Sequence, residues 1–371
     1  MAKELAHFQN FAKLKDTQVA FNDITVIAGK PSTGKSYVMK MMYAIKVASY
    51  LVTEEPTAFP REIDEIEASL EKSSELDEIE IKKLIEKLSL IKKDVLHVQN
   101  NINQYIKNKF QQECQNVSQA IFKDIKQISN NFSINTNCLK LEYKNIFEIE
   151  SCEKYDFSNY EPIFVETPLI LEFKSFMKRE KGKVPYHIES LLNVLDTDYS
   201  FTDEEQDKFI KEFTQKSKEI IKGDIESSGD SFIFNKEDEK NYDIINASSG
   251  TKSIGLLQYL VTNKALKKGS VLYWEEPEVH LHPEWQLRMI ELFVELMNAG
   301  VKIVFSTHSP YMCDYLNAIS QKQNFNDRVS FNLFEETDSV VNNHILESDE
   351  DWNKIQAELL DPLEEIMWEY I

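Results

Sequence analysis

Cysteine is scarce in this sequence. The 371 residues contain only Cys114, Cys138, Cys152 and Cys313, which show no paired spacing, whereas disulfide-dependent secreted domains carry a denser and more regular set. Long hydrophobic runs are also missing: no stretch offers about 18 consecutive apolar residues, and the opening MAKELAH contains no apolar segment of signal-peptide length. These absences exclude a disulfide framework. They predict a cytoplasmic protein that is neither secreted nor membrane-spanning.

Basic residues are outnumbered. The chain has 42 Lys and Arg against 63 Asp and Glu, which gives a net charge of −21. Nucleic acid and anionic membranes repel such a protein on average. DNA contact would therefore need a local basic patch. The lysine pairs at 82–83, 92–93 and 267–268 are candidates for one, although solvated helix faces explain them more simply.

Glycine is absent from residues 54–130, a segment rich in Glu, Lys, Ile and Leu. We interpret it as a helical insertion. Apolar residues alternate at spacings of three and four, the period of a coiled-coil seam; they are Ile81, Leu84, Leu88, Ile91, Val95, Val98, Ile102 and Tyr105. Ile63, Ile66 and Leu70 supply a shorter helix. A projecting helical hairpin and an amphipathic helix packed on its own domain are both compatible with this pattern.

A phosphate-binding pattern stands out near the start of the chain. GKPSTGKS, residues 29–36, follows the apolar run 24–28 and precedes a helix expected over 36–50. In a G-x-x-x-x-G-K-[ST] loop, backbone N–H groups point at phosphate oxygens, and the following helix N-terminus adds a favourable dipole. Lys35 would reach the β and γ phosphates, and the Ser36 hydroxyl would be a ligand of Mg²⁺.

Three further motifs follow in the second half of the chain. The apolar strand in VLYWEEPE, residues 271–278, ends in acids, of which Glu275 suits the magnesium water shell and Glu276 suits a general base. His308 in VFSTHSP could sense the γ-phosphate by hydrogen bonding. The serine-glycine loop NASSGTKS, residues 246–253, opens a helix and suits anion capture.

These four motifs, in this order, resemble those of ABC-type ATPases of the RecF, SMC and OLD lineage. GKPSTGKS resembles the Walker A loop, ASSGTKS the signature loop, VLYWEEPEVHLHP the Walker B motif with the D-loop, and FSTHSP the switch histidine. The resemblance covers about residues 5–50 and 240–320. It extends to the ATPase subunits of bacterial anti-phage defence modules, of the PtuA and AriA type.

In that family two ATP molecules lie between two heads, and each Walker A loop faces the signature loop of the other head. The resemblance therefore implies ATP and Mg²⁺ as cofactors and a homodimer that forms on ATP, with a higher oligomer left open. It implies catalytic roles for Lys35, Glu276 and His308, and magnesium binding by Ser36 and Glu275. The implied nucleotide contacts are Gly29, Lys30, Pro31, Ser32, Thr33, Gly34, Lys35, Ser36 and Tyr37 in cis, and Ser248, Ser249 and Gly250 in trans.

The sequence departs from the family pattern in three places. Glu275 stands where Walker B usually has aspartate, and the signature has Ser-Ser-Gly instead of Ser-Gly-Gly. No Q-loop glutamine can be placed, although Glu166 and Thr167 occupy a suitable location. His280-x-His282 has no evident third ligand, so a zinc site is not favoured.

Alternating strands and helices predict the fold class. We expect β-like structure over 131–175, including a strand at 162–171, helices over 185–222, and a turn or hairpin at 223–230. A strand at 270–274, a helix at 283–298 and a strand at 301–306 follow. The pattern predicts an α/β P-loop NTPase with a mostly parallel sheet. Residues 1–53 and 131–371 would form the ATPase head, with a helical subregion near 175–222, and 54–130 would form the inserted arm.

The chain after the switch histidine limits the possible functions. Residues 311–371 are too few for the nuclease domain that follows the ATPase in OLD-type proteins, and they end in an acidic amphipathic tail. We therefore expect an ATPase that regulates a separately encoded effector, a nuclease or toxin, in anti-phage defence. The alternative is a RecF-like or SMC-like DNA-maintenance ATPase whose closed dimer grips DNA. The signature and switch motifs weaken the case for a stand-alone kinase or GTPase.

Overall fold

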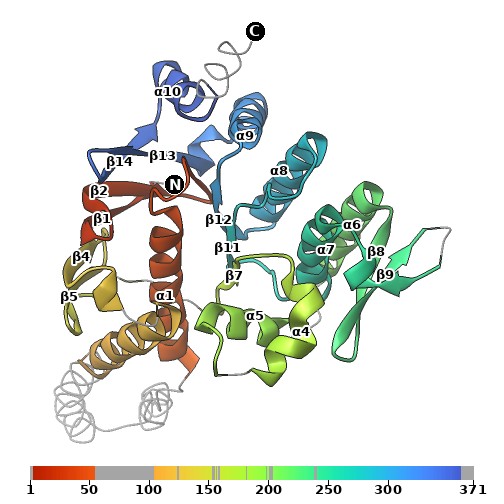
Figure 1. The fold of residues 1–371 in the computed structure, drawn as a ribbon, viewed down its shortest axis with the longest axis horizontal. Helices are drawn as coiled ribbons and strands as arrows, with labels where there is room; N and C mark the ends of the chain where they lie inside the picture. Colours follow the sequence, from red (N-terminus) through yellow and green to blue (C-terminus); the bar gives the residue numbers. More distant parts are fainter. Residues whose placement is uncertain are drawn as a thin grey trace, which may run out of the picture.

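A six-stranded sheet runs through the middle of the protein and separates two hydrophobic cores (Figure 1). The computed structural model describes residues 3–54, 104–122, 125–152, 159–180, 182–197, 204–237 and 240–360, together with residues 155, 157 and 199. Alternate residues of the sheet strands belong to different cores: Ile24 and Val26 face one core, and Ile27 faces the other. The sheet is therefore buried on both faces.

The central sheet has the strand order β14-β13-β3-β12-β11-β7. Its parallel strands are β3 (Ile24–Gly29), β7 (Ile163–Val165), β11 (Val271–Glu275), β12 (Lys302–Thr307) and β13 (Val329–Thr337). At one edge β14 (Val340–Leu346) pairs antiparallel with β13. Strands covered on both faces are mostly apolar, as in the fully buried β3, in which Thr25 is the one polar side chain. The prediction of a mostly parallel sheet is confirmed.

A second sheet and helix α1 (Lys35–Glu54) cover one face of the central sheet. The second sheet is antiparallel, in the order β2-β1-β4-β5-β6. Its strands are β1 (Glu4–Phe11), β2 (Leu14–Phe21), β4 (Asn131–Asn135), β5 (Lys140–Lys144) and β6 (Phe147–Ser151), and the short helix η2 (Ile125–Gln127) leads into β4. Phe132 stacks on Tyr143 with ring centroids 5.0 Å apart. A helix over 104–122 packs onto this core through Phe110 and Cys114.

The other face is covered by helices (Figure 1). They are α4 (Ile170–Arg179), α5 (Tyr186–Asp196), α6 (Glu204–Ile221), α7 (Ser249–Thr262), α8 (Pro283–Asn298) and α9 (Pro310–Lys322). A small sheet of β8 (Gly223–Ser228), β9 (Ser231–Lys236) and β10 (Tyr242–Asp243) contacts α6 and α7. The remaining elements are η3 (Ile244–Asn246), η4 (Asn326–Arg328) and α10 (Asp349–Leu359), which contacts α9 and β14.

Most element boundaries agree with the sequence analysis. Helix α8 has the predicted limits, because Pro283 occupies its first turn and Gly300 follows it with a φ of 85°. The predicted hairpin at 223–230 is confirmed as β8 and β9, which turn at Gly229. No helix in the described part of the chain combines the length and apolarity needed to cross a membrane.

The predicted strand at 162–171 is wrong in its second half. Only Ile163–Val165 pair with β11, and from Ile170 the chain is helical. Ile170, Leu171 and Lys174 fall at helical spacing on one buried face, which a strand with its period of two cannot provide. The predicted coiled-coil seam before Tyr105, the shorter helix near 63–70 and the tail beyond residue 360 lie outside the described residues.

Candidate nucleotide site

The glycine loop lies between β3 and α1, at the carboxyl end of an interior strand of the sheet. Gly29 has a φ of 139°, and a Cβ there would lie 2.3 Å from the carbonyl oxygen of Phe334 on β13. Ser32 and Gly34 also have positive φ, 65° and 88°. The loop thus curls tightly before the N-terminus of α1, a geometry that suits bound phosphate.

The other predicted loop residues differ in their surroundings. Pro31, Ser32 and Ser36 are exposed, and so is Tyr37, at 43%. The Thr33 hydroxyl donates to the Lys30 carbonyl oxygen at 2.9 Å. The Lys30 ammonium pairs with Glu358 of α10 at 3.1 Å.

Lys35 bends back over the loop. Its Nζ donates hydrogen bonds to the carbonyl oxygens of Gly29, at 2.8 Å, and Lys30, at 2.7 Å. Burial lowers the pKa of Lys35 to about 8, although three nearby carboxylates act in the opposite direction; these are Glu276, Glu278 and Glu275. The Thr33 hydroxyl is a third neutral partner, at 3.5 Å. An ammonium hydrogen-bonded only to neutral oxygens gains a stronger partner when a phosphate oxygen enters the loop.

Glu275 is the last residue of β11 and pairs in register with Ser306 of β12. Burial raises the pKa of Glu275 to about 7, whereas Lys40 and a hydrogen bond with Ser36 lower it. The Oε1 atom of Glu275 is buried and has no hydrogen-bond partner in the structure. Its ion pair with Lys40, at 3.9 Å, does not supply a hydrogen bond, and a buried oxygen without one is costly. A hard cation that takes oxygen ligands would satisfy it, so Ser36 and Glu275 fit the predicted Mg²⁺.

Glu276 and His308 are directly joined. His308 Nε2 lies 2.7 Å from Glu276 Oε1, although the two residues follow different strands. Glu276 has a φ of 46°, which is strained for a non-glycine residue, and its backbone N–H donates to the Ser306 carbonyl at 3.1 Å. Glu276 is thus held both at its backbone N–H and at its carboxylate. Chemically, the pair can accept a proton and share the resulting charge.

Glu278 is a site residue that the sequence analysis missed. Its Oε1 accepts hydrogen bonds from the Thr307 hydroxyl, at 2.8 Å, and from the His308 backbone N–H, at 2.6 Å. Burial raises the pKa of Glu278. The carboxyl group therefore ties the loop after β11 to the loop after β12. The sequence feature that could have identified Glu278 is its position as the third acid of EEPE, residues 275–278.

A second group of charges adjoins Glu275. Lys40 on α1 pairs with Glu166, which directly follows β7, and Glu166 contacts His187 on α5. The hydrogen bond with His187, together with Lys40, lowers the pKa of Glu166 to about 2, and burial lowers the pKa of His187. Glu166 thus occupies a sheet position beside Glu275, and its suggested place as the Q-loop residue stays a prediction. Lys40 and His187 carried no motif that would have identified them.

The signature residues lie apart from the P-loop. Ser248 caps α7 by accepting a hydrogen bond from the Thr251 backbone N–H at 3.1 Å. Within the described residues, no hydrogen bond or ion pair joins Ser248, Ser249 or Gly250 to residues 29–37. Figure 1 draws α7 beyond β11 and β7 from α1. One head thus brings together only the residues predicted to act in cis.

Neighbouring side chains pack against the signature loop and the start of α7. A Cβ on Gly250 would lie 3.2 Å from the Trp285 ring and 3.3 Å from Leu281. Lys252 is 3% exposed and forms an ion pair with Glu172 on α4. These contacts fix the start of α7 relative to α4 and α8.

Two alternative sites gain no support. His282 caps α8 by accepting from the Glu284 backbone N–H, and His280 is exposed. Across the described ranges, no group of three His, Cys, Asp or Glu could hold a metal. Lys267, from the lysine pair at 267–268, covers the Tyr160 ring at 4.3 Å, and burial lowers its pKa.

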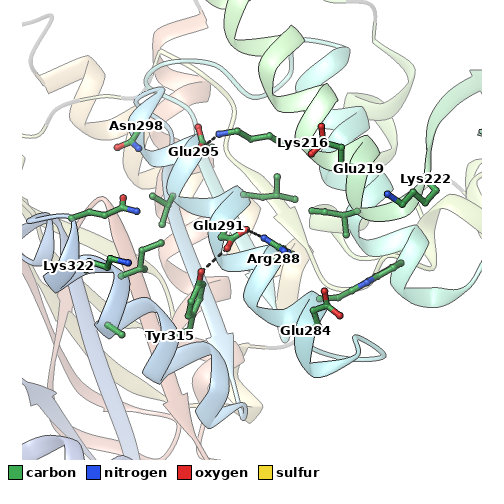
Figure 2. A pocket seen from close by; sticks show the side chains of 17 residues that line it. Lys216, Glu219, Lys222, Glu284, Arg288, Glu291, Glu295, Asn298, Tyr315 and Lys322 are labelled. Atoms are coloured by element: carbon green, nitrogen blue, oxygen red, sulfur yellow. Dashed lines mark hydrogen bonds and ion pairs between the residues drawn. The ribbon is translucent and has the colours of Figure 1, made fainter.

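A groove of about 800 Å³ lies between α6, α8 and α9, away from the P-loop (Figure 2). Lys216 pairs with Glu295 across it, and Glu291 accepts from Arg288 at 2.9 Å and from the Tyr315 hydroxyl at 2.7 Å. Because charges of both signs pair within the groove, it lacks the electrostatic character of a phosphate site.

Comparison with known proteins gives one family match and several distant structural similarities. Residues 178–314 match the family described as "AAA domain, putative AbiEii toxin, Type IV TA system". This range includes the signature loop, the acids after β11 and His308 but not the P-loop. A search of curated proteins gives no match.

The solved structures that are similar at low identity include the following three. One, a SmcHead bound to the C-winged helix domain of ScpA, has a TM-score of 0.47 and 10% identity, covering 95% of this chain and 100% of that chain. The SMC head domain from Thermotoga maritima has a TM-score of 0.43 and 10% identity, covering 94% and 100%. A Smc head with an extended coiled coil, bound to the C-terminal domain of ScpA derived from Pyrococcus furiosus, has a TM-score of 0.44 and 11% identity, covering 96% and 98%.

The class of the protein follows from its own geometry. A glycine loop follows β3, paired acids follow β11, a histidine follows β12, and a serine-glycine loop opens α7. β3, β12 and β11 are consecutive neighbours in a mostly parallel sheet. The fold is that of an α/β P-loop NTPase with an ABC-type head.

Proposed function

We propose that the protein is an ABC-like ATPase that binds and hydrolyses ATP with Mg²⁺, dimerises on ATP and regulates a separately encoded effector, a nuclease or toxin, in anti-phage defence. One observation carries the ATPase assignment. Lys35, the paired carboxylates Glu275 and Glu276, and His308 converge at the carboxyl ends of three adjacent strands. Phosphoryl transfer to water needs this set of a cation, a metal-binding carboxylate and a base.

Each residue would have a separate role in ATP hydrolysis. Lys35 exchanges its carbonyl partners for phosphate oxygens, and Ser36 with Glu275 holds Mg²⁺. The metal, when bound, neutralises charge on the transferred phosphoryl group. Glu276 takes a proton from the attacking water, and His308 orients the Glu276 carboxylate and can turn toward the γ-phosphate.

Exposed apolar side chains support a dimer. Tyr37 follows the P-loop, Val279 follows the acids, Tyr311 follows His308, and Ile245 precedes the signature loop; these four are 40–58% exposed. Large apolar residues that gather around functional motifs commonly mark an interface. A second head that packs against these residues would cover them and bring its own signature loop to the P-loop.

The family match and the charge of the chain support the effector role. The matched family description names a toxin of a Type IV TA system, and the net charge of −21 disfavours DNA as the main partner. Of the lysine pairs proposed for DNA contact, those at 82–83 and 92–93 lie outside the described residues, and Lys267 covers an aromatic ring. A protein partner is therefore the better-supported proposal.

The test is affinity purification of Glu276→Gln with ATP from cells that carry the native gene neighbourhood, with Lys35→Ala purified in parallel. We expect ATP and a stoichiometric protein partner with Glu276→Gln and neither with Lys35→Ala. Nuclease-sensitive DNA without a protein partner would favour the DNA-maintenance alternative. Absence of ATP from both preparations, together with no hydrolysis by the wild type, would refute the ATPase assignment.

A further inference from the structure

Lys40 takes no part in the proposed mechanism, yet it adjoins the metal-binding carboxylate. It lies one helical turn after Ser36, on the same face of α1. Its Nζ is 3.0 Å from Glu166 Oε1 and 3.9 Å from Glu275 Oε1. The Lys40 and Glu275 side chains are 17% and 12% exposed. Charges so close together and partly shielded from water interact strongly.

Glu166 fixes the position of Lys40. The register of β7 against β11 pairs Val165 with Trp274, so Glu166 and Glu275 follow at the same level of the sheet. The second carboxylate oxygen of Glu166 lies 2.7 Å from His187 Nε2. The His187 side chain is 2% exposed and packs edge-on against Phe164. The two carboxylate oxygens of Glu166 are thus held by different residues, Oε1 by Lys40 and Oε2 by His187.

This arrangement keeps the Lys40 ammonium close to Glu275 but does not give the Glu275 Oε1 atom a hydrogen bond. Glu275 Oε1 has no hydrogen-bond partner although the ammonium is only 3.9 Å away. The ammonium has further donors, but its contact with Glu166 at 3.0 Å leaves it beyond hydrogen-bonding distance of that oxygen. Direct contact would place a competing cation on the oxygen that fits Mg²⁺.

We propose that Lys40, held away from Glu275 by Glu166, is a positioning residue that sets how strongly nucleotide binding depends on Mg²⁺. The inference rests on the proposed nucleotide function. Lys40 repels a divalent cation and attracts the polyanionic nucleotide, so it weakens Mg²⁺ binding and strengthens metal-free nucleotide binding. Glu166 has the opposite effect on both, because it adds negative charge and restrains the ammonium.

The test compares nucleotide binding with and without metal. The dissociation constant of a fluorescent, non-hydrolysable ATP analogue is measured in EDTA and in saturating MgCl₂, and the magnesium ratio is the first value divided by the second. We expect Lys40→Met to raise this ratio about tenfold. Glu166→Gln should lower it several-fold, and Lys40→Arg should keep it near the wild-type value.

Lys46→Met is the matched control, because Lys46 lies on the same helix over the Tyr155 ring. Its ratio should be unchanged, and the melting temperatures of all variants confirm folding. A lysine that only supports the fold would weaken binding equally in both buffers, so an unchanged or lowered ratio in Lys40→Met overturns the inference. So does a raised ratio in Glu166→Gln. If the wild type binds no analogue in either buffer, the proposed function itself fails.

Discussion

Glu276 is constrained both at its backbone and at its side chain. Its φ of 46°, its backbone hydrogen bond to Ser306 and its contact with His308 hold one carboxylate in one direction. Strained backbone of this kind persists only where surrounding contacts determine it. A fixed carboxylate suits a base that must meet a single water molecule.

The first residue-scale prediction concerns this carboxylate. Glu276→Gln keeps the size and most of the hydrogen bonding but cannot take a proton. We expect ATP affinity to be retained and the hydrolysis rate to fall by about 10²–10⁴-fold, as measured by phosphate release. Glu291→Gln, in the groove of Figure 2, is the control and should hydrolyse normally. Equal hydrolysis by wild type and Glu276→Gln would remove Glu276 as the base.

The second residue-scale prediction concerns Gly29. In Gly29→Ala the new methyl group would lie 2.3 Å from a backbone oxygen of β13, in a conformation with a φ of 139°. We expect the free energy of unfolding to fall by about 3 kcal/mol or more and nucleotide binding to be lost. Gly182→Ala also has positive φ but nothing within 4 Å, and should cost about 1–2 kcal/mol. Urea unfolding of both variants makes the comparison.

Sequence patterns locate some of these residues and not others. Lys35, Ser36, Glu275, Glu276 and His308 stand at fixed positions after apolar strands, so their convergence could be anticipated. Lys40 and Glu166 are separated by 126 residues. Their pairing depends on the placement of β7 beside β11, and nothing in the local sequence near Lys40 encodes it.

At the scale of elements, a buried lysine joins the helical subregion to the β8–β9 hairpin. Lys174 on α4 is 1% exposed, pairs with Asp196 at the end of α5 at 2.8 Å, and lies over the Phe232 ring of β9 at 4.5 Å. It also donates to the Gly229 carbonyl at 3.4 Å. One ammonium thus connects α4, the end of α5 and the β8–β9 hairpin.

The element-scale prediction removes the partner of this ammonium. Asp196→Asn leaves Lys174 buried without a counter-charge, which should lower the free energy of unfolding by about 2–4 kcal/mol. This expected loss of unfolding free energy is smaller than for a fully buried ion pair, because the Asp196 side chain is 33% exposed. Asp230→Asn is the control, because Asp230 is 71% exposed and contacts Lys178, and it should cost under about 1 kcal/mol. Equal costs would contradict the role given to Lys174.

The same pair gives a pH dependence. Burial alone would raise the pKa of Asp196, but the hydrogen bonds from Lys174 and Lys178 outweigh it, and the pKa is lowered. The stability that Asp196 contributes is therefore complete above its unfolded pKa of about 4 and is lost as the pH falls through its lower folded pKa. Asp196→Asn should lose less stability than the wild type on acidification below pH 4.

Element boundaries were predictable where local chemistry fixes them. Pro283 and Gly300 bracket α8, and its predicted limits are correct. The segment after Val165 was misassigned because Pro162 and Pro168 suggested a strand between them, whereas Pro168 instead stands in the turn that starts α4. The local sequence could not indicate that the buried side of this segment would face helices and a hairpin.

At the scale of the whole molecule, one chain keeps its serine-glycine loop at the start of α7 apart from its own P-loop. The signature loop is held away from the P-loop of its own chain by contacts with Trp285, Leu281 and Glu172. If hydrolysis needs both loops, each active site must combine two chains.

Mixing two inactive variants tests this composite arrangement. Lys35→Ala disables the P-loop, and Ser249→Arg disables the signature loop, so neither should hydrolyse ATP alone. An equal mixture should recover about one quarter of the wild-type rate, because half of the dimers are mixed and each has one intact site. Phosphate release from the mixture is the measurement. If activity does not return although gel filtration detects mixed dimers, the two loops do not act across chains.

The position of β3 bears on how this chain folds during synthesis. β3 is made early, but its neighbours β12 and β13 belong to the last third of the chain, and Ala20 just before it hydrogen-bonds with Asn332, 312 residues later. At about 5–20 residues per second, a ribosome needs roughly 15–60 s to deliver those partners. During that interval an apolar strand and the P-loop beside it lack their final neighbours. The nascent chain therefore cannot hold nucleotide in a finished site until translation is nearly complete.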